Sequence, residues 1–133
     1  MRNLDMSAAQ TAQNIVAALA PPGAKKEAAA LDNLATKALG VLQENGVYAA
    51  TLFLYSRTSA ADKQVAGPLR HQLLALAAGL APGGAPVMDG ADASAALKFV
   101  TERLAGDLDT LLLVKQVWEQ TLIYVRYGAK AQG

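Results

Sequence analysis

His71 is the only histidine in the chain, and histidine is the side chain best suited to proton transfer near neutral pH. A catalytic histidine needs an orienting partner, and a metal-binding histidine needs further ligands close by. The sequence around His71 offers neither, although Arg70 directly precedes it. We therefore expect His71 to lie at the surface or to face a phosphate group.

Carboxylates in the second half of the chain form another candidate site. Asp107 and Asp109, with Asp89 and Asp92 upstream, are of the type that binds a divalent cation. Carboxylates at helix starts are also expected as caps and as partners of the helix dipole. The paired Glu-x-x-His pattern of di-iron bundles is absent. The structural role is favoured, and we expect no metal site.

Motifs for phosphate binding and nucleophilic catalysis are missing from the sequence. Gly83-Gly84 is not followed by the Lys-Ser/Thr pair of a P-loop, and no serine has the context of a nucleophile elbow. The chain has no cysteine, which excludes disulfides, thiolate catalysis and cysteine-based zinc sites. We expect a protein that is not an enzyme, with no catalytic residue, no cofactor and no small-molecule substrate.

The composition indicates the elements that position these side chains. The 133 residues are 53% hydrophobic, with 29 alanines and only 7 aromatic residues, a balance typical of closely packed helices. A chain of this length can bury a hydrophobic core as one unit. We expect an all-α fold: a single-domain compact bundle of about six helices over residues 1–133.

The segment 39–57 suggests the centre of this bundle. Val47 to Tyr55 is apolar or small at nearly every position, with Thr51 the exception, which is typical of a helix buried on all sides. A buried strand would give the same run, but no second alternating segment exists to pair with it. Asn45-Gly46 then ends the preceding helix. We expect this short helix to lie at the centre, with Phe53 in the core.

Two further helices are expected before this segment, and helix-capping and helix-breaking residues set their limits. Ser7-x-x-Gln10 matches a capping box for the first helix, which Pro21-Pro22-Gly23 ends. The second is expected from about Ala24 to Asn45.

Three more helices are expected after the helix predicted over Val47 to Tyr55. Ser59 or Asp62 is expected to cap a helix whose first turn contains Pro68. A Gly/Pro-rich loop at 81–93 precedes a helix over about 94–105. Asp107 or Asp109 is expected to cap the last helix, which buries Trp118.

Neither an export signal nor a membrane span is expected. The polar run 7–14 leaves too short an apolar core for a signal peptide, and Lys115 and Glu119 interrupt the run 108–125. We therefore expect a cytoplasmic protein without membrane contact.

The charge distribution provides the candidate binding residues. Net charge is only +1, but acids dominate from Asp89 to Asp109, whereas cations dominate from 57 to 71 and from 110 onward, where Tyr124 and Tyr127 also lie. A basic face with aromatic residues, opposite an acidic face, fits a module that stacks head to tail along a phosphate backbone. Ordinary solvated helix faces explain the charges slightly better. The candidate nucleic-acid-binding residues are Arg57, Lys63, Arg70, Lys115 and Arg126.

The central segment also resembles a known family. The run E-N-G-V-Y at 44–48, followed by A-A-T-L-F-L at 49–54, is similar to the small helical subunit of the type III-B (Cmr) CRISPR effector complexes. The last helix, Leu111 to Ala129, resembles that family's closing helix, which carries a tryptophan flanked by leucine and a basic residue.

The resemblance implies a non-catalytic subunit that takes part in antiviral defence. Several copies would line a filament of larger subunits and support the duplex of crRNA and target RNA, or the displaced strands, without reading sequence. The implied partners are other Cmr subunits, further copies of this chain, crRNA and target RNA. Two alternatives remain open: a helical adaptor or oligomerisation protein unrelated to nucleic acid, and an enzyme that uses scattered carboxylates.

Overall fold

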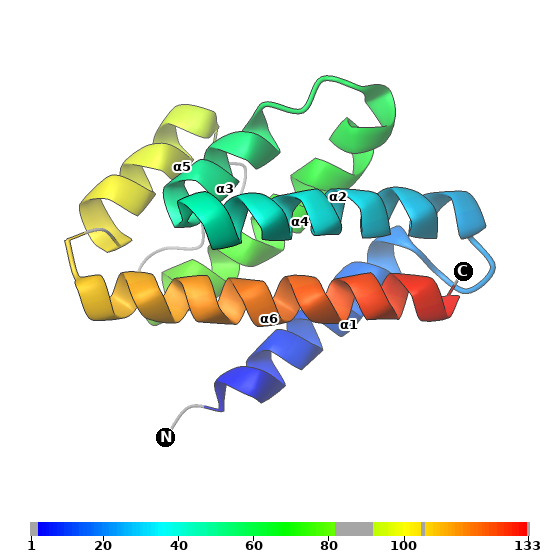
Figure 1. Cartoon of the computed structure of the whole chain (residues 1–133), viewed down its shortest axis with the longest axis horizontal. Helices are drawn as coiled ribbons and strands as arrows, with labels where there is room; N and C mark the ends of the chain where they lie inside the picture. The colour runs from blue at the N-terminus through cyan, green and yellow to red at the C-terminus, as the bar shows by residue number, and fades with distance from the viewer. Residues whose placement is uncertain (1–2, 82–91, 105, 133) are drawn as a thin grey trace.

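The computed structural model describes residues 3–81, 92–104 and 106–132, and these residues form an all-α bundle. Within the described residues there are six α-helices and one π-helical turn, and there is no strand (Figure 1). The elements are α1 (Leu4–Leu19), α2 (Lys25–Asn45), α3 (Val47–Tyr55), α4 (Ala60–Leu80), α5 (Ala93–Phe99), the π turn η1 (Val100–Leu104) and α6 (Leu108–Gln132). The expected fold class is therefore confirmed.

The longest helix, α6, packs against α1, α2, α3 and α4. It lies antiparallel to α2 along much of its length and also packs against α1, while α4 contacts it from another side (Figure 1). Trp118 in the middle of α6 is only 1% exposed, and its Nε1 donates a hydrogen bond of 2.8 Å to the Leu73 carbonyl oxygen of α4. This bond joins the two helices across the core.

The short helix α3 has the predicted limits, but its predicted central position is wrong. Val47, Ala50 and Leu54 are buried, whereas Tyr48 is 45% exposed and Leu52 is 47% exposed. Phe53 packs against the core from its edge and is half-buried. The helix is apolar all round, yet the other helices cover only the side that carries Val47, Ala50 and Leu54.

Two predictions about helix starts are wrong. Helix α1 begins at Leu4, capped by the Asn3 side chain, which accepts a 3.0 Å hydrogen bond from the Met6 amide, so Ser7 lies inside the helix. Ser59 caps α4 as predicted, but Pro68 lies in the helix interior and not in its first turn. Proline there removes one intrahelical hydrogen bond, the one that Gln64 would accept four residues earlier, and both residues are exposed.

The second half of the chain follows the predicted order with one addition. The Asp92 side chain caps α5 by accepting a 2.8 Å hydrogen bond from the Ala95 amide. Helix α5 then continues as η1, and this junction buries Phe99, which the sequence pattern did not identify. Asp107 accepts a 3.3 Å hydrogen bond from the Thr110 amide and so caps α6. Of the predicted loop at 81–93, residues 82–91 lie outside the described residues.

The hydrophobic core contains side chains from all six helices, with many alanines that allow close approach. Helices α1 and α6 approach closely at Gly128, where an added Cβ would lie 3.0 Å from Val16 Cγ2. Among the described helices, none has the length and apolar character needed to cross a lipid bilayer.

Candidate nucleic-acid interface

Arg57 and Arg70 lie at the carboxyl end of α3, and both bind its backbone. Arg57 Nε donates a 3.1 Å hydrogen bond to the Phe53 carbonyl, and its guanidinium carbon lies 3.8 Å from the centroid of the Phe53 ring. Arg70 reaches across from α4: its Nη1 donates a 3.4 Å hydrogen bond to the Leu54 carbonyl, and its guanidinium carbon lies 4.2 Å from the centroid of the Tyr55 ring.

These contacts give the two arginines a structural role. The last carbonyls of a helix carry partial negative charge, so guanidinium groups are stabilising there. The Phe53 carbonyl also accepts hydrogen bonds from the Ser56 amide (3.1 Å) and hydroxyl (2.9 Å), so Arg57 adds to donors already present. Arg57 and Arg70 are half-buried. The charge pattern had suggested freely solvated cations at these positions. The structure instead shows Arg57 bound to Phe53 and Ser56 in its own segment, and Arg70 joining α4 to the end of α3.

The two candidates on α6 differ from one another. Arg126 Nε lies 3.6 Å from Asp32 Oδ1 on α2, with 31% of the arginine side chain and 23% of the aspartate side chain exposed. This ion pair bridges α2 and α6 and partly neutralises Arg126. Lys115, eleven residues earlier, is half-buried on nearly the same side of α6. The structure thus brings Arg57 and Arg70 together at α3 and leaves Lys115 and Arg126 on the seam between α2 and α6.

Lys63 is the one candidate that is fully exposed, in the first turn of α4. Exposed cations outside the candidate set include Lys25 and Lys26 at the start of α2 and Lys130 at the end of α6. The start of α2 and the end of α6 lie far apart in the sequence, so a charge pattern read along the chain does not group these lysines, whereas the fold does. His71 and Asp107 are both half-buried, and Asp107 is used as a helix cap.

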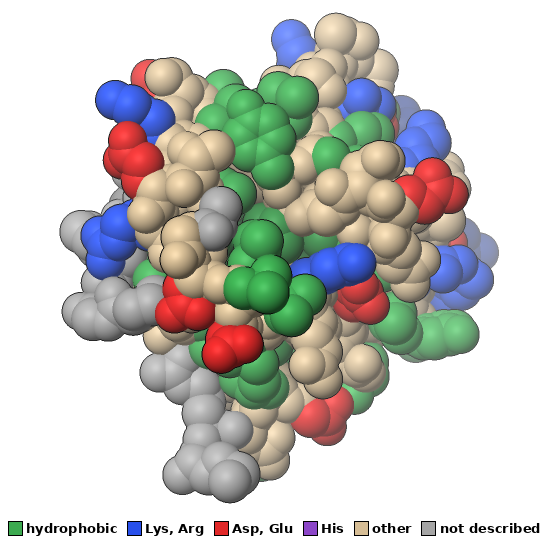
Figure 2. Space-filling model, turned by 60° about the vertical axis from the view of Figure 1, so that its left-hand side comes forward, with side chains coloured by type: hydrophobic (Ala, Val, Ile, Leu, Met, Phe, Trp, Pro, Cys, Tyr) green, Lys and Arg blue, Asp and Glu red, His purple; other side chains and the backbone are tan. Residues whose placement is uncertain are grey.

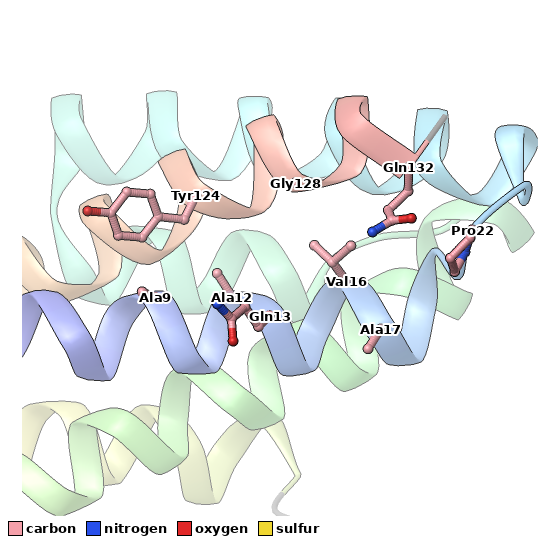
Figure 3. A pocket seen from close by; sticks show the side chains of 9 residues that line it. All are labelled: Ala9, Ala12, Gln13, Val16, Ala17, Pro22, Tyr124, Gly128 and Gln132. Carbon is pink, nitrogen blue, oxygen red and sulfur yellow. The ribbon is translucent and has the colours of Figure 1, made fainter.

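A groove of about 570 Å³ runs between α1 and α6. Its wall is mostly apolar, and Figure 3 shows Val16 pointing from α1 toward Gly128 and Gln132 on α6. The lining residues are Ala9, Ala12, Gln13, Val16, Ala17, Pro22, Tyr124, Gly128 and Gln132. None of these side chains carries a charge at neutral pH, so the groove offers no electrostatic attraction to an anion.

Tyr124 borders this groove and joins it to the start of α1. Its hydroxyl donates a short hydrogen bond to Asp5 Oδ1. Because that bond requires the hydroxyl proton, Asp5 raises the pKa of Tyr124 above its usual value. At neutral pH the bond is intact and ties α6 to the first turn of α1.

Exposed hydrophobic side chains lie on two helices that contact one another, α3 and α6. Tyr48 and Leu52 lie one turn apart on α3 and are about half exposed, and Leu108 (66%) and Leu112 (55%) are likewise one turn apart on α6. We call these four residues the apolar patch. Figure 2 shows this side of the molecule, with hydrophobic side chains exposed between charged ones. Neighbouring exposed apolar side chains of this size are typical of surfaces that contact another macromolecule.

Comparison with protein-family models, with curated proteins and with solved structures finds no match for this chain.

Proposed function

We propose that this chain is a non-catalytic helical subunit of a larger cytoplasmic assembly, and that the assembly is a type III-B RNA-guided complex that captures target RNA in antiviral defence. The observation that supports a subunit role most strongly is the apolar patch. Leaving four large apolar side chains in water is unfavourable for a free-standing protein, and covering them with a neighbouring subunit is favourable by about 25 cal/mol per Å² removed from water.

The RNA-guided identity rests on the resemblance at 44–54 and in the last helix, together with the uneven distribution of charge. The acids Glu102, Asp107 and Asp109 lie near the junction of η1 and α6, whereas Lys25 and Lys130 lie toward the opposite end of these long helices (Figure 1). Opposite charges at two ends favour an array in which one copy follows another along a phosphate backbone.

A helical adaptor unrelated to nucleic acid is the second candidate, since the apolar patch fits that role equally well. Affinity purification of the tagged native chain, followed by sequencing of any co-purified RNA, separates the two. The proposed function predicts larger subunits together with guide RNA of uniform length. The purification is carried out both with and without nuclease inhibitors. Recovery of protein partners without RNA under both conditions would support the adaptor and overturn the RNA-guided proposal.

A matched pair of variants tests the patch. Leu52→Ser and Leu112→Ser alter exposed positions and should leave the fold intact, because exposed substitutions change the free energy of unfolding by no more than about 0.5 kcal/mol. Recovery of partner subunits should fall. The control is Met6→Ser, since Met6 is equally exposed (55%) but lies on α1, outside the patch. Equal recovery with all three variants would exclude the patch as the subunit contact.

A further inference from the structure

The end of the bundle at which α2 begins and α6 ends carries a group of exposed lysines. Figure 1 shows the turn between α1 and α2, the carboxyl end of α6 and the start of α4 at the same end of the molecule. The Gly23 amide of that turn donates a 3.5 Å hydrogen bond to the Gln132 carbonyl, which fixes the end of α6 against it. Lys26 and Gln64 line one shared hollow, so the first turns of α2 and α4 are also adjacent.

The ion pair between Arg126 and Asp32 sets the register that brings two of these lysines together. Lys130 follows Arg126 by four residues and Lys25 precedes Asp32 by seven, and both spacings return to the same side of a helix. Because α2 and α6 are antiparallel, both lysines lie toward the same end, about 6 and 10.5 Å along the helices from the ion pair at a rise of 1.5 Å per residue. Lys25 and Lys130 therefore flank one seam.

The charges at this end are available for a partner. Lys25, Lys26, Lys63 and Lys130 are exposed, and within the described ranges none of their ammonium groups forms an ion pair. Two carboxylates, Glu27 and Asp62, lie in the same first turns, so cations outnumber acids by four to two. The arginines at α3 differ, because their guanidinium groups are already bound to backbone carbonyls.

An exposed aromatic ring accompanies the lysines. Tyr127 is 64% exposed, and Lys130 Nζ lies 5.9 Å from the centroid of its ring. Proteins that bind single-stranded nucleic acid combine cations that follow the backbone with aromatic side chains on which unpaired bases stack. Lysines beside an exposed tyrosine provide both parts.

We infer that this basic end, defined as Lys25, Lys26, Lys63, Lys130 and Tyr127, is the surface that binds single-stranded RNA through its phosphates and one unpaired base. The inference rests on the proposed function for its choice of RNA. It moves the binding surface away from four of the five residues suggested by the charge pattern and keeps Lys63.

The test compares two charge reversals in the full chain. The first variant is Lys25→Glu with Lys130→Glu. The control is Lys37→Glu with Lys98→Glu, which makes the same change in net charge at exposed positions on α2 and α5. Lys37 lies about 18 Å along α2 from Lys25, beyond the screening length of physiological salt. Circular dichroism melts establish that both variants fold.

The probe is a labelled oligouridine, titrated by fluorescence anisotropy between about 50 and 200 mM salt. We expect the first variant to lose at least about tenfold in affinity and to reduce the slope of log K against log salt by about 1.4, for two phosphate contacts on a single strand. The control should lose less than about threefold. Equal losses in both variants would overturn the inference, and so would a wild-type chain that fails to bind at low salt.

Two further measurements test the contribution of the Tyr127 ring and the chemical class of the partner. Tyr127→Ala should weaken oligouridine binding about fivefold. The control is Tyr48→Ala, at the other exposed tyrosine, which should not change it.

Vesicles containing phosphatidylserine offer anionic charge without bases. Binding to vesicles but not to oligouridine would overturn RNA as the partner. The first variant could lose oligouridine binding while the native chain purifies without guide RNA. That pair of results would support the basic end as the RNA-binding surface and reject the proposed function.

Discussion

Replacing Trp118 with phenylalanine tests whether α6 is the centre of the fold. The substitution removes the indole N–H that donates to the Leu73 carbonyl and leaves a smaller ring in a site that is 1% exposed. Leu73 lies inside α4, so its carbonyl keeps an intrahelical donor after the substitution. Loss of the indole hydrogen bond therefore lowers the free energy of unfolding only by the net contribution of one hydrogen bond, about 1 kcal/mol. A residual cavity on the order of 40 Å³, at about 24 cal/mol per Å³, adds about 1 kcal/mol.

The expected loss in the free energy of unfolding is therefore about 2 kcal/mol, equivalent to a fall of about 8 °C in melting temperature for a chain of this size. Urea denaturation followed by far-ultraviolet circular dichroism measures it, since Trp118 is the only tryptophan and its fluorescence disappears with the substitution. Tyr48→Phe, at a half-exposed ring, is the control and should stay within about 0.5 kcal/mol. A loss below about 0.5 kcal/mol for the tryptophan variant would refute the central position of α6.

Three further predictions concern contacts between helices. Gly128→Ala should destabilise the fold by up to about 2 kcal/mol, because the new methyl group would meet Val16 at 3.0 Å, a clash of about 1–3 kcal/mol that is offset by about 1 kcal/mol of helix propensity. Urea denaturation should show that Val16→Ala in the same chain recovers part of this loss. Arg70→Met, which keeps the length of the side chain, should destabilise by about 1–2 kcal/mol as the hydrogen bond to the end of α3 is lost, and a neutral effect in the same assay would contradict the capping role. The raised pKa of Tyr124 means that its bond to Asp5 stabilises the fold fully below about pH 10, the unfolded value, and that this stabilisation disappears as pH rises through the folded pKa. Melts at pH values on either side of this range should show the wild type losing more stability than Tyr124→Phe, and parallel losses would contradict the assignment.

The limits of the helices could be predicted where the sequence contains a strong local signal. Asn45-Gly46 separates α2 from α3, and Gly46 has the positive φ of 93° that favours glycine. Ser59, Asp92 and Asp107 cap helices, as their residue types predicted. The start of α1 was mispredicted because Asn3 and Ser7 are both good caps, and the sequence alone does not rank them.

The position of each helix in the bundle was harder to predict. Val47 to Tyr55 has the composition of a buried helix, but burial depends on which elements cover it, and that depends on packing between distant segments. The groups that the candidate cations contact are also determined by packing between distant segments. Arg70 binds a carbonyl sixteen residues away, and Arg126 pairs with an aspartate on another helix. Composition indicates that a cation is present, whereas only the fold determines whether its charge is available to a binding partner.

The packing of α1 against α6 has a consequence for the kinetics of folding. The bond between Asp5 and Tyr124 spans 119 residues, so the contacts that bury Ile15 and Val16 form only after almost the whole described chain has been brought together. Most helical bundles fold rapidly through local contacts, and closing so long a loop adds an entropic cost before any contact is gained. A partly folded species in which α2 to α6 are assembled would leave the apolar side of α1 exposed to water. The final and slowest step of folding is therefore expected to be the docking of α1 onto α6, and aggregation during refolding is expected to begin from the species that precedes it.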